Sequence, residues 1–163
     1  MSAAAALRKH TRPLKWEDLA IVEKALRPAD RLELEAAGLP ALDNLKRAYA
    51  DQSLTNYAII SPNTGMPFGV FGVSTAGVVW LVSTTEIGRH VKTFLQESRK
   101  WIDLFQEVHP VLWNWVDSRN TLHLKWLTKW LGFRITAEGE AYGNKYYKVE
   151  RPANKSQVEI SDF

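Results

Sequence analysis

The sequence predicts the mixed α/β class, with a single domain in which one β-sheet is flanked by helices. The chain has 163 residues, a length that suits one domain with its own core. Its apolar residues follow a helical spacing at first and form continuous, strand-like runs from residue 56. A strand, a long helix and another strand then follow one another, which implies a parallel crossover and a mixed sheet. We expect the domain to span residues 1–150 and the polar residues 151–163 to form a flexible tail.

Short helices are predicted for the first third of the chain. Apolar residues recur there at intervals of three and four, with charged residues between them. Pro28 ends the first helix and Gly38 ends the second. The predicted helices cover residues 16–26, 31–37 and 42–49, after an edge strand near Leu7 and Leu14.

The middle of the chain predicts three strands. Turn signals at residues 61–65 and 75–77 separate three apolar runs, so we expect an antiparallel meander. The third run, Val78–Val82, is apolar throughout, which is typical of a strand that is buried on both faces in mid-sheet. The predicted strands cover residues 56–60, 67–73 and 78–82.

Two helices and two strands are predicted for the remainder. A long helix starts near residue 87 and ends before His109-Pro110, and a strand rich in aromatic residues follows at 111–116. The next helix covers residues 120–131, and Gly132 is placed as its C-terminal cap. The last strand or hairpin covers residues 142–149.

Composition excludes several classes of site. Lys and Arg (21) exceed Asp and Glu (18) by 3, and the basic residues are scattered. The absence of cysteine excludes disulfides, a thiol nucleophile and cysteine-based zinc sites. The 4 histidines have no metal-ligand spacing, so no metal is expected. No apolar run has the length of a membrane span, and the N-terminal alanines do not form a secretory signal, so we expect a cytoplasmic protein.

Tryptophan is unusually frequent, with 7 residues in the chain. Trp113 and Trp115 share one face of the predicted strand, and Trp126 and Trp130 share one face of the following helix. These four residues predict core packing or a surface that docks onto a partner protein. Their alternation with Lys125, Lys129 and Arg119 is also compatible with stacking on single-stranded nucleic acid. We favour packing and protein docking, and expect no nucleic-acid binding.

The order of these elements resembles the GCN5-related N-acetyltransferase (GNAT) family over roughly residues 7–150. Pro67–Val73 is similar to the third-strand hairpin of that family, and Leu131-Gly132-Phe133 follows an Asn-led helix, as it does there. The segment Val116–His123, with Lys125-Trp126-Leu127, further resembles the GNAT-like internal virion protein of short-tailed phages. This second resemblance implies a phage origin, a role in virion assembly or infection, and a location in the host cytoplasm or the virion.

The resemblance also implies a coenzyme A loop, which is altered here. The family motif Gln/Arg-x-x-Gly-x-Gly/Ala binds the pyrophosphate through backbone amides at a helix N-terminus. Gly88 takes the place of the first glycine, but Thr85 replaces Gln/Arg and His90 replaces the last small residue. By this alignment, Thr85, Gly88, Arg89 and Asn120 are the candidate residues for binding acetyl-CoA.

The same loop has a purely structural interpretation. Ser83 and Glu86 have the spacing of a capping box, which would occupy the amides that a pyrophosphate needs. Arg89, His90 and Lys92 favour the anion site instead, because cations near a helix start oppose its dipole unless an anion is bound.

Candidates for acid–base chemistry are few. Thr128 stands where many GNAT enzymes have a tyrosine that protonates the thiolate, and Asn120 lies one residue farther from Gly132 than is usual. A helical insertion would bring Trp126 or Leu127 to that place, but neither can donate a proton to sulfur. His123, on the same helix, is either a replacement for that tyrosine as the acid or a histidine that only packs in the fold. Glu86 is the carboxylate near the expected cleft, but the capping box already uses it.

These departures lead to two functional hypotheses. The first is a phage internal virion or morphogenesis protein whose acetyl-CoA site is degraded. The alternative is an active N-acetyltransferase that moves an acetyl group from acetyl-CoA to an amine of a host or phage target.

Overall fold

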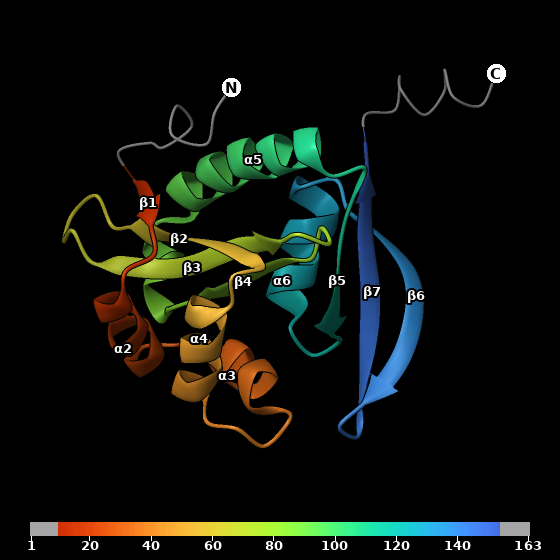
Figure 1. Cartoon of the computed structure of the whole chain (residues 1–163), viewed down its shortest axis with the longest axis horizontal. Coiled ribbons are helices and arrows are strands. Elements are labelled where there is room, and N and C mark those ends of the chain that lie inside the picture. Colours follow the sequence, from red (N-terminus) through yellow and green to blue (C-terminus); the bar gives the residue numbers. More distant parts are fainter. Residues whose placement is uncertain (1–9, 154–163) are drawn as a thin grey trace.

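The computed structural model describes residues 10–153 and confirms the mixed α/β class (Figure 1). It contains a four-stranded sheet of order β1-β2-β3-β4 and a three-stranded sheet of order β5-β7-β6, with helices packed against them. Leu7 and most of the predicted tail lie outside the described residues.

The four-stranded sheet is the predicted antiparallel meander with an edge strand added. Its strands are β1 (Thr11–Pro13), β2 (Leu54–Ile60), β3 (Pro67–Ser74) and β4 (Val79–Ser83). All three pairings are antiparallel. The predicted edge strand is therefore confirmed, whereas β4 lies at the border of this sheet and not in its middle.

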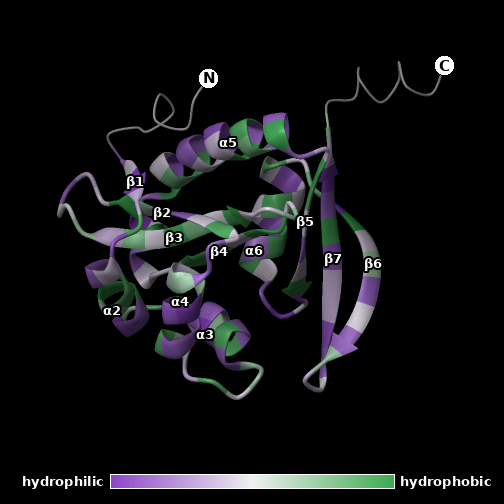
Figure 2. Cartoon of the chain, viewed as in Figure 1, coloured by the Kyte–Doolittle hydropathy of each residue, from purple (hydrophilic) through white to green (hydrophobic). Residues whose placement is uncertain are grey.

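Helices cover both faces of this sheet. One face packs against α2 (Trp16–Lys24), α3 (Pro28–Glu35) and α4 (Ala41–Ala50), and the other against α5 (Val91–Val108) (Figures 1 and 2). Pro28 starts α3 as well as ending the preceding helix, because the first turn of a helix does not need its N–H. The long helix starts later than predicted, since Thr85–Arg89 forms the 3-10 helix η1.

The three-stranded sheet consists of β5 (Val111–Asp117), β6 (Arg134–Ala141) and β7 (Asn144–Pro152). The single strand or hairpin predicted at 142–149 is thus the centre of a longer hairpin. We did not predict β6, because most of its side chains are exposed and only one is strongly hydrophobic (Figure 2). The strand β7 continues through Arg151 and Pro152, two residues beyond the predicted end of the domain at residue 150.

The two sheets meet at the starts of β4 and β5. Val78 and Trp113 form a parallel bridge, and the Trp113 amide donates to the Gly77 carbonyl at 3.0 Å. The side chain of Asn114 then donates to the Val79 carbonyl at 2.7 Å. The parallel pairing predicted for these two strands is therefore present, but it consists of one bridge and not of a continuous ladder. Because the Asn114 side chain takes the place of the next ladder bond, the strands separate and leave a wedge between them.

The helix after β5 contains the predicted insertion. It starts as α6 (Thr121–Lys125) and continues as the π-helix η2 (Trp126–Trp130). The Leu131 amide donates to the Trp126 carbonyl five residues earlier, at 2.9 Å, so the helix holds one extra residue. Gly132 ends it at φ +80°, as predicted for a C-terminal cap.

Candidate functional site

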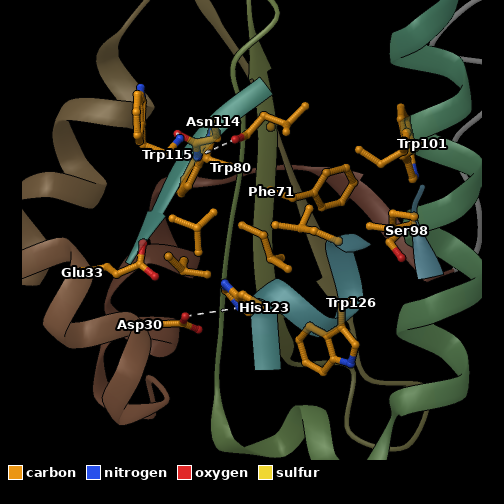
Figure 3. A pocket seen from close by; sticks show the side chains of 18 of the residues that line it. Asp30, Glu33, Phe71, Trp80, Ser98, Trp101, Asn114, Trp115, His123 and Trp126 are labelled. Carbon is orange, nitrogen blue, oxygen red and sulfur yellow. Dashed lines mark hydrogen bonds and ion pairs between the residues drawn. The ribbon is translucent and has the colours of Figure 1, made fainter. Parts of the chain in front are cut away.

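A cavity of about 330 Å³ lies in the wedge between β4 and β5. It passes through the sheet, because residues of α3 line one end and residues of α5 line the other. Figure 3 shows Asp30 and Glu33 at the α3 end and Ser98 and Trp101 at the α5 end. Most of the wall is apolar or aromatic, which is the usual character of a small-molecule site. The wall includes Phe71, Val79, Leu81, Phe94, Ile102, Phe105, Val116, Trp126 and Leu127.

The edge of β4 that faces the cavity carries backbone groups with no partner on β3. The Ser74 amide donates to the Val78 carbonyl, and the Thr84 amide to the Phe68 carbonyl, both at 2.9 Å. Since hydrogen-bonded residues alternate along an antiparallel pair, the even-numbered residues of β4 bond β3 and the odd-numbered ones face the wedge. The amide and carbonyl of Leu81 therefore point into the cavity, where a bound chain can pair with them.

Asp30 is the centre of a buried polar cluster at the α3 end. Its side chain is 1% exposed. It accepts hydrogen bonds from the Ser83 amide and from Asn120 Nδ2, both at 2.9 Å. Arg27 Nη1 lies 3.3 Å from the same carboxylate, so the buried charge is paired. These contacts join α3 to the end of β4 and to the start of α6.

Glu33 lies one turn farther along α3 and also lines the cavity. Asn120 Nδ2 donates to Glu33 Oε1 at 2.8 Å, so one amide group bridges the carboxylates of Glu33 and Asp30. Burial raises the pKa of Glu33 to about 7, opposed by the hydrogen bond from Asn120 and assisted by the charges of Asp30 and Asp117. A carboxyl group that titrates near neutral pH is suited to accept a proton during catalysis.

His123, a predicted acid candidate, lines the same cavity. Its Nε2 lies 3.3 Å from Asp30 Oδ1, the contact dashed in Figure 3, but the two atoms lack the geometry of a hydrogen bond. Burial lowers the pKa of His123 to about 4, with the Arg27 charge acting in the same direction and the Asp30 charge opposing both. The ring is therefore neutral at pH 7, and an imidazolium is not available there to protonate a thiolate.

The predicted capping box is wrong. Ser83 is buried, and its hydroxyl donates to Asp30 at 3.3 Å, so it does not cap the following helix. Thr84 caps η1 instead, because its hydroxyl accepts a hydrogen bond from the Glu86 amide at 3.2 Å. The Glu86 side chain is half exposed and lies 3.8 Å from His90 Nε2, and Glu86 is not among the residues that line the cavity.

The side chain of His90, which replaces a small residue of the coenzyme motif, points away from the start of α5. His90 Nε2 lies 3.2 Å from Ser61 Oγ, and its ring centroid lies 5.0 Å from that of Phe68. The His90 side chain is therefore buried against β3 and the turn that precedes it. It leaves the backbone at the start of α5 free to approach a ligand.

The start of α5 has the features of an anion site. Among residues 10–153 no side chain caps this helix, and the Phe94 amide makes its first helical bond, so the amides of three helical residues precede it. Thr85, Gly88 and Arg89 are exposed in η1, and a Cβ at Gly88 would meet open space. These three predicted residues lie together, whereas Asn120, the fourth, lies in the Asp30 cluster and holds carboxylates instead.

Thr128 does not replace the tyrosine of the family. Its hydroxyl donates to the Leu124 carbonyl at 2.7 Å, within the helix. The extra residue of η2 brings Trp126 and Leu127 to the cavity wall, as the insertion hypothesis expected. Tyr146 of β7 also lines the cavity, and burial raises its pKa above the ordinary value of 10.

The four tryptophans of the predicted docking surface do not share one face. Trp126 is buried between Phe94 and His123, so it cannot contact a partner. Trp130 packs under Arg99, whereas Trp113 of β5 lies under Lys148 of β7. Trp113, Trp115 and Trp130 remain partly exposed, and protein docking through them stays a prediction.

Sequence reasoning missed Asp30 and Glu33. Both lie on a short, strongly charged helix, which is typical of a solvated surface, and no motif marks them. Their partner Asn120 is 90 residues from Asp30 along the chain, so only the tertiary structure makes them a site. Among residues 10–153 there is no group of three metal-ligating side chains, and none of the described helices is long and apolar enough to cross a membrane.

The fold matches solved structures of acetyltransferases. No model of a known protein family matches the chain, and no curated protein matches it either. The aminoglycoside acetyltransferase AAC(6')-Ib in complex with ribostamycin and coenzyme A superposes with a TM-score of 0.64 at 14% identity, over 94% of this chain and 97% of that one. Ribosomal-protein-S5-alanine acetyltransferase from Vibrio fischeri gives 0.64 at 15% identity, over 91% and 96%. A GCN5-related N-acetyltransferase from Kribbella flavida gives 0.62 at 18% identity, over 92% and 99%. The chain therefore has the GNAT fold.

Proposed function

We propose that this protein binds an acyl-coenzyme A thioester, with acetyl-CoA as the simplest case, and transfers the acyl group to a primary amine. One observation carries the proposal: a single cavity connects the free edge of β4 to Glu33, a carboxyl group with a pKa of about 7. An acyl transfer needs both parts, because the thioester must be held in place and the amine must lose a proton.

Three features support binding of the coenzyme. The uncapped start of α5 offers amides to a pyrophosphate, with the exposed Arg89 and Lys92 nearby as cations. The apolar cavity suits the pantetheine arm, whose amide can donate a hydrogen bond to the Leu81 carbonyl as an added strand does. A hydrogen bond from the Leu81 amide to the thioester carbonyl would also stabilise the negative charge that develops on its oxygen.

Glu33 and Tyr146 support the proton transfers. Glu33 accepts a proton from the entering ammonium group, and the free amine then attacks the carbonyl carbon. The carbon–sulfur bond breaks as the amide forms. The thiolate takes up a proton from Tyr146, which the raised pKa of this residue keeps protonated at neutral pH. Tyr146 regains its proton from the nitrogen of the new amide, so that one proton in total passes from nitrogen to sulfur.

The first test is binding of acetyl-CoA, measured by isothermal titration calorimetry. We expect a single site in the wild-type protein and weaker binding in Leu81→Pro, which lacks the N–H that points into the cavity. Because this N–H is not used by β3, the β-ladder should persist, and circular dichroism checks the fold. An absence of heat at high micromolar acetyl-CoA would contradict the proposal.

The second test is transfer to pentylamine, followed as release of free thiol. Glu33→Gln should lower kcat/KM by 10²-fold or more, on the order expected for loss of a general base. Glu107→Gln, an exposed residue of α5, is the matched control and should leave the rate unchanged. In the wild type the rate should rise with pH and level off above about 7, as Glu33 loses its proton. A rate without this rise would exclude Glu33 as the base.

A virion role is a second proposal, supported by the resemblance of the segment around α6 to the internal virion protein of short-tailed phages. In this case the acetyl-CoA site is degraded, and the partly exposed Trp113, Trp115 and Trp130 contact virion or host proteins. The calorimetric experiment separates the two proposals, because only the first expects heat. Mass spectrometry of purified phage particles tests the virion role directly, and absence of the protein from them would contradict it.

A further inference from the structure

Three aromatic side chains line the cavity on the side that also contains Glu33. Trp80 comes from β4, Trp115 from β5 and Tyr142 from the turn between β6 and β7, and all three line the cavity. Figure 3 shows Trp80 and Trp115 on the side of the cavity away from α5. Trp115 is 38% exposed and Tyr142 is 62% exposed, so this end of the cavity is open to solvent.

The two tryptophans at this opening differ from most others in the chain. Elsewhere in residues 10–153, a Lys or Arg of the chain lies over a tryptophan ring in four cases, 4.4–5.8 Å from the centroid. The tryptophans with such a cation are Trp16, Trp113, Trp126 and Trp130. Trp80, Trp101 and Trp115 have none among the described residues, and Trp101 is buried at 1% exposure. The partly exposed tryptophans without such a cation are thus Trp80 and Trp115, both at this opening.

The ring of Trp115 is held in place by a glycine of the neighbouring hairpin. A Cβ at Gly139 of β6 would lie 3.3 Å from Cζ3 of Trp115 and 3.4 Å from Cη2. A larger residue would therefore require the ring to shift by a few tenths of an ångström, and glycine lets it lie directly against β6. This contact helps to position the Trp115 ring.

Tyr142 has an unfavourable backbone conformation. Its φ is +52°, a region that bulky residues avoid, and Gly143 follows at +74°. Such hairpin turns favour Asn-Gly, because asparagine tolerates positive φ. A strained tyrosine at a position where asparagine fits better indicates that its side chain has a role, and it is one of the residues that line the cavity.

We infer, on the premise of the proposed acyl transfer, that the acceptor is an alkylamine that enters as its ammonium ion, held by the aromatic rings of Trp80, Trp115 and Tyr142 on the side of the cavity that contains Glu33. The ring faces attract the ammonium group, and the apolar wall accommodates the alkyl chain. Glu33 then removes one proton and leaves the neutral amine beside the thioester.

The test uses pentylamine and pentan-1-ol, which have similar shapes but differ in charge, and it omits acetyl-CoA. Binding is followed by NMR of the tryptophan indole N–H groups. We expect the wild type to prefer pentylamine, and Trp115→Leu to weaken pentylamine binding by about fivefold with little change for the alcohol. Trp130→Leu is the matched control, because Trp130 is similarly exposed (37% against 38%) but already carries Arg99. Equal affinity for amine and alcohol, or an equal loss in the control, would overturn the inference.

Tyr142→Asn provides a second variant, which we expect to fold because asparagine tolerates positive φ and the site is exposed. It relieves the positive-φ strain, so its Tm should rise by about 2 °C, while pentylamine binding weakens about twofold to fivefold. A rise in Tm without weaker binding would remove Tyr142 from the acceptor site. If pentylamine binds but acetyl-CoA does not, the acceptor site stands and the transferase proposal fails. If acetyl-CoA binds and pentylamine does not, the reverse holds.

Discussion

The two ends of the cavity are built from opposite kinds of interaction. At the α5 end, Phe94, Trp101 and Phe105 pack against the sheet through apolar and aromatic surfaces. At the α3 end, Asp30 and Glu33 are held by hydrogen bonds and charge pairing. The apolar end gains stability from the area that it buries, whereas the polar end is stable only while every partner is present. The polar end is therefore expected to respond to single substitutions and to pH, and the apolar end to changes in volume.

The largest effect is expected from removing the centre of the polar end. Asp30→Ala leaves Arg27 without its buried partner and removes the acceptor of Asn120 and of the Ser83 amide. We expect the free energy of unfolding to fall by about 3–5 kcal/mol. Urea unfolding at pH 7 measures the change, and Asp43→Ala on the exposed side of α4 should cost less than about 1 kcal/mol. A similar small loss for both variants would mean that the cluster does not stabilise the fold.

The next effect is a dependence of stability on pH in which two groups of the polar end oppose each other. The pKa of Glu33 is about 7 in the folded chain against an ordinary 4.5, so the folded state holds a proton that the unfolded chain has released. The free energy of unfolding therefore falls as pH rises from 4.5 to 7. The pKa of His123 is about 4 against an ordinary 6.5, so its contribution rises over the range from 4 to 6.5. Each contribution is about 3 kcal/mol in total, and they nearly cancel in the wild type.

Two variants separate these contributions. In Glu33→Gln the histidine is the member of this pair that remains, so stability should rise by about 2 kcal/mol between pH 4.5 and 6.5. In His123→Gln only the carboxyl group remains, so stability should fall over the same interval. Chemical unfolding at several pH values measures both slopes. Parallel slopes in the two variants would contradict the opposing titrations.

The same contrast explains which features could be predicted from the sequence. The packed elements follow from periodicity, and even the extra residue of η2 was visible as a long spacing from Asn120 to Gly132. The strand β6 was not predicted, because a polar, exposed strand has no apolar pattern in its sequence. The sequence located the candidate coenzyme loop at the start of α5. It could not give the direction of the His90 side chain, because that depends on Ser61 in the distant turn after β2.

The polar end could not be predicted because its chemistry depends on contacts between distant segments. Glu33 has an ordinary sequence context, and its raised pKa comes from burial under elements that lie far along the chain. Asn120 was a candidate for binding the coenzyme, whereas its side chain bridges Asp30 and Glu33. Hydrogen-bond partners of this kind have no local signal, unlike the periodicity of a helix.

The smallest effect is expected from filling the apolar end. Ser98 lies on the cavity wall, and its hydroxyl bonds only the Leu95 carbonyl of its own helix. Ser98→Leu would place additional methyl groups in the cavity and should stabilise the fold by about 1 kcal/mol. The same change should abolish binding of acetyl-CoA, because the pantetheine arm needs this space. Gln96→Leu, exposed on the same helix, is the control and should leave coenzyme binding intact. If Ser98→Leu binds acetyl-CoA normally, the thioester does not occupy the apolar end, and the division of the cavity into a coenzyme end and an acceptor end is wrong.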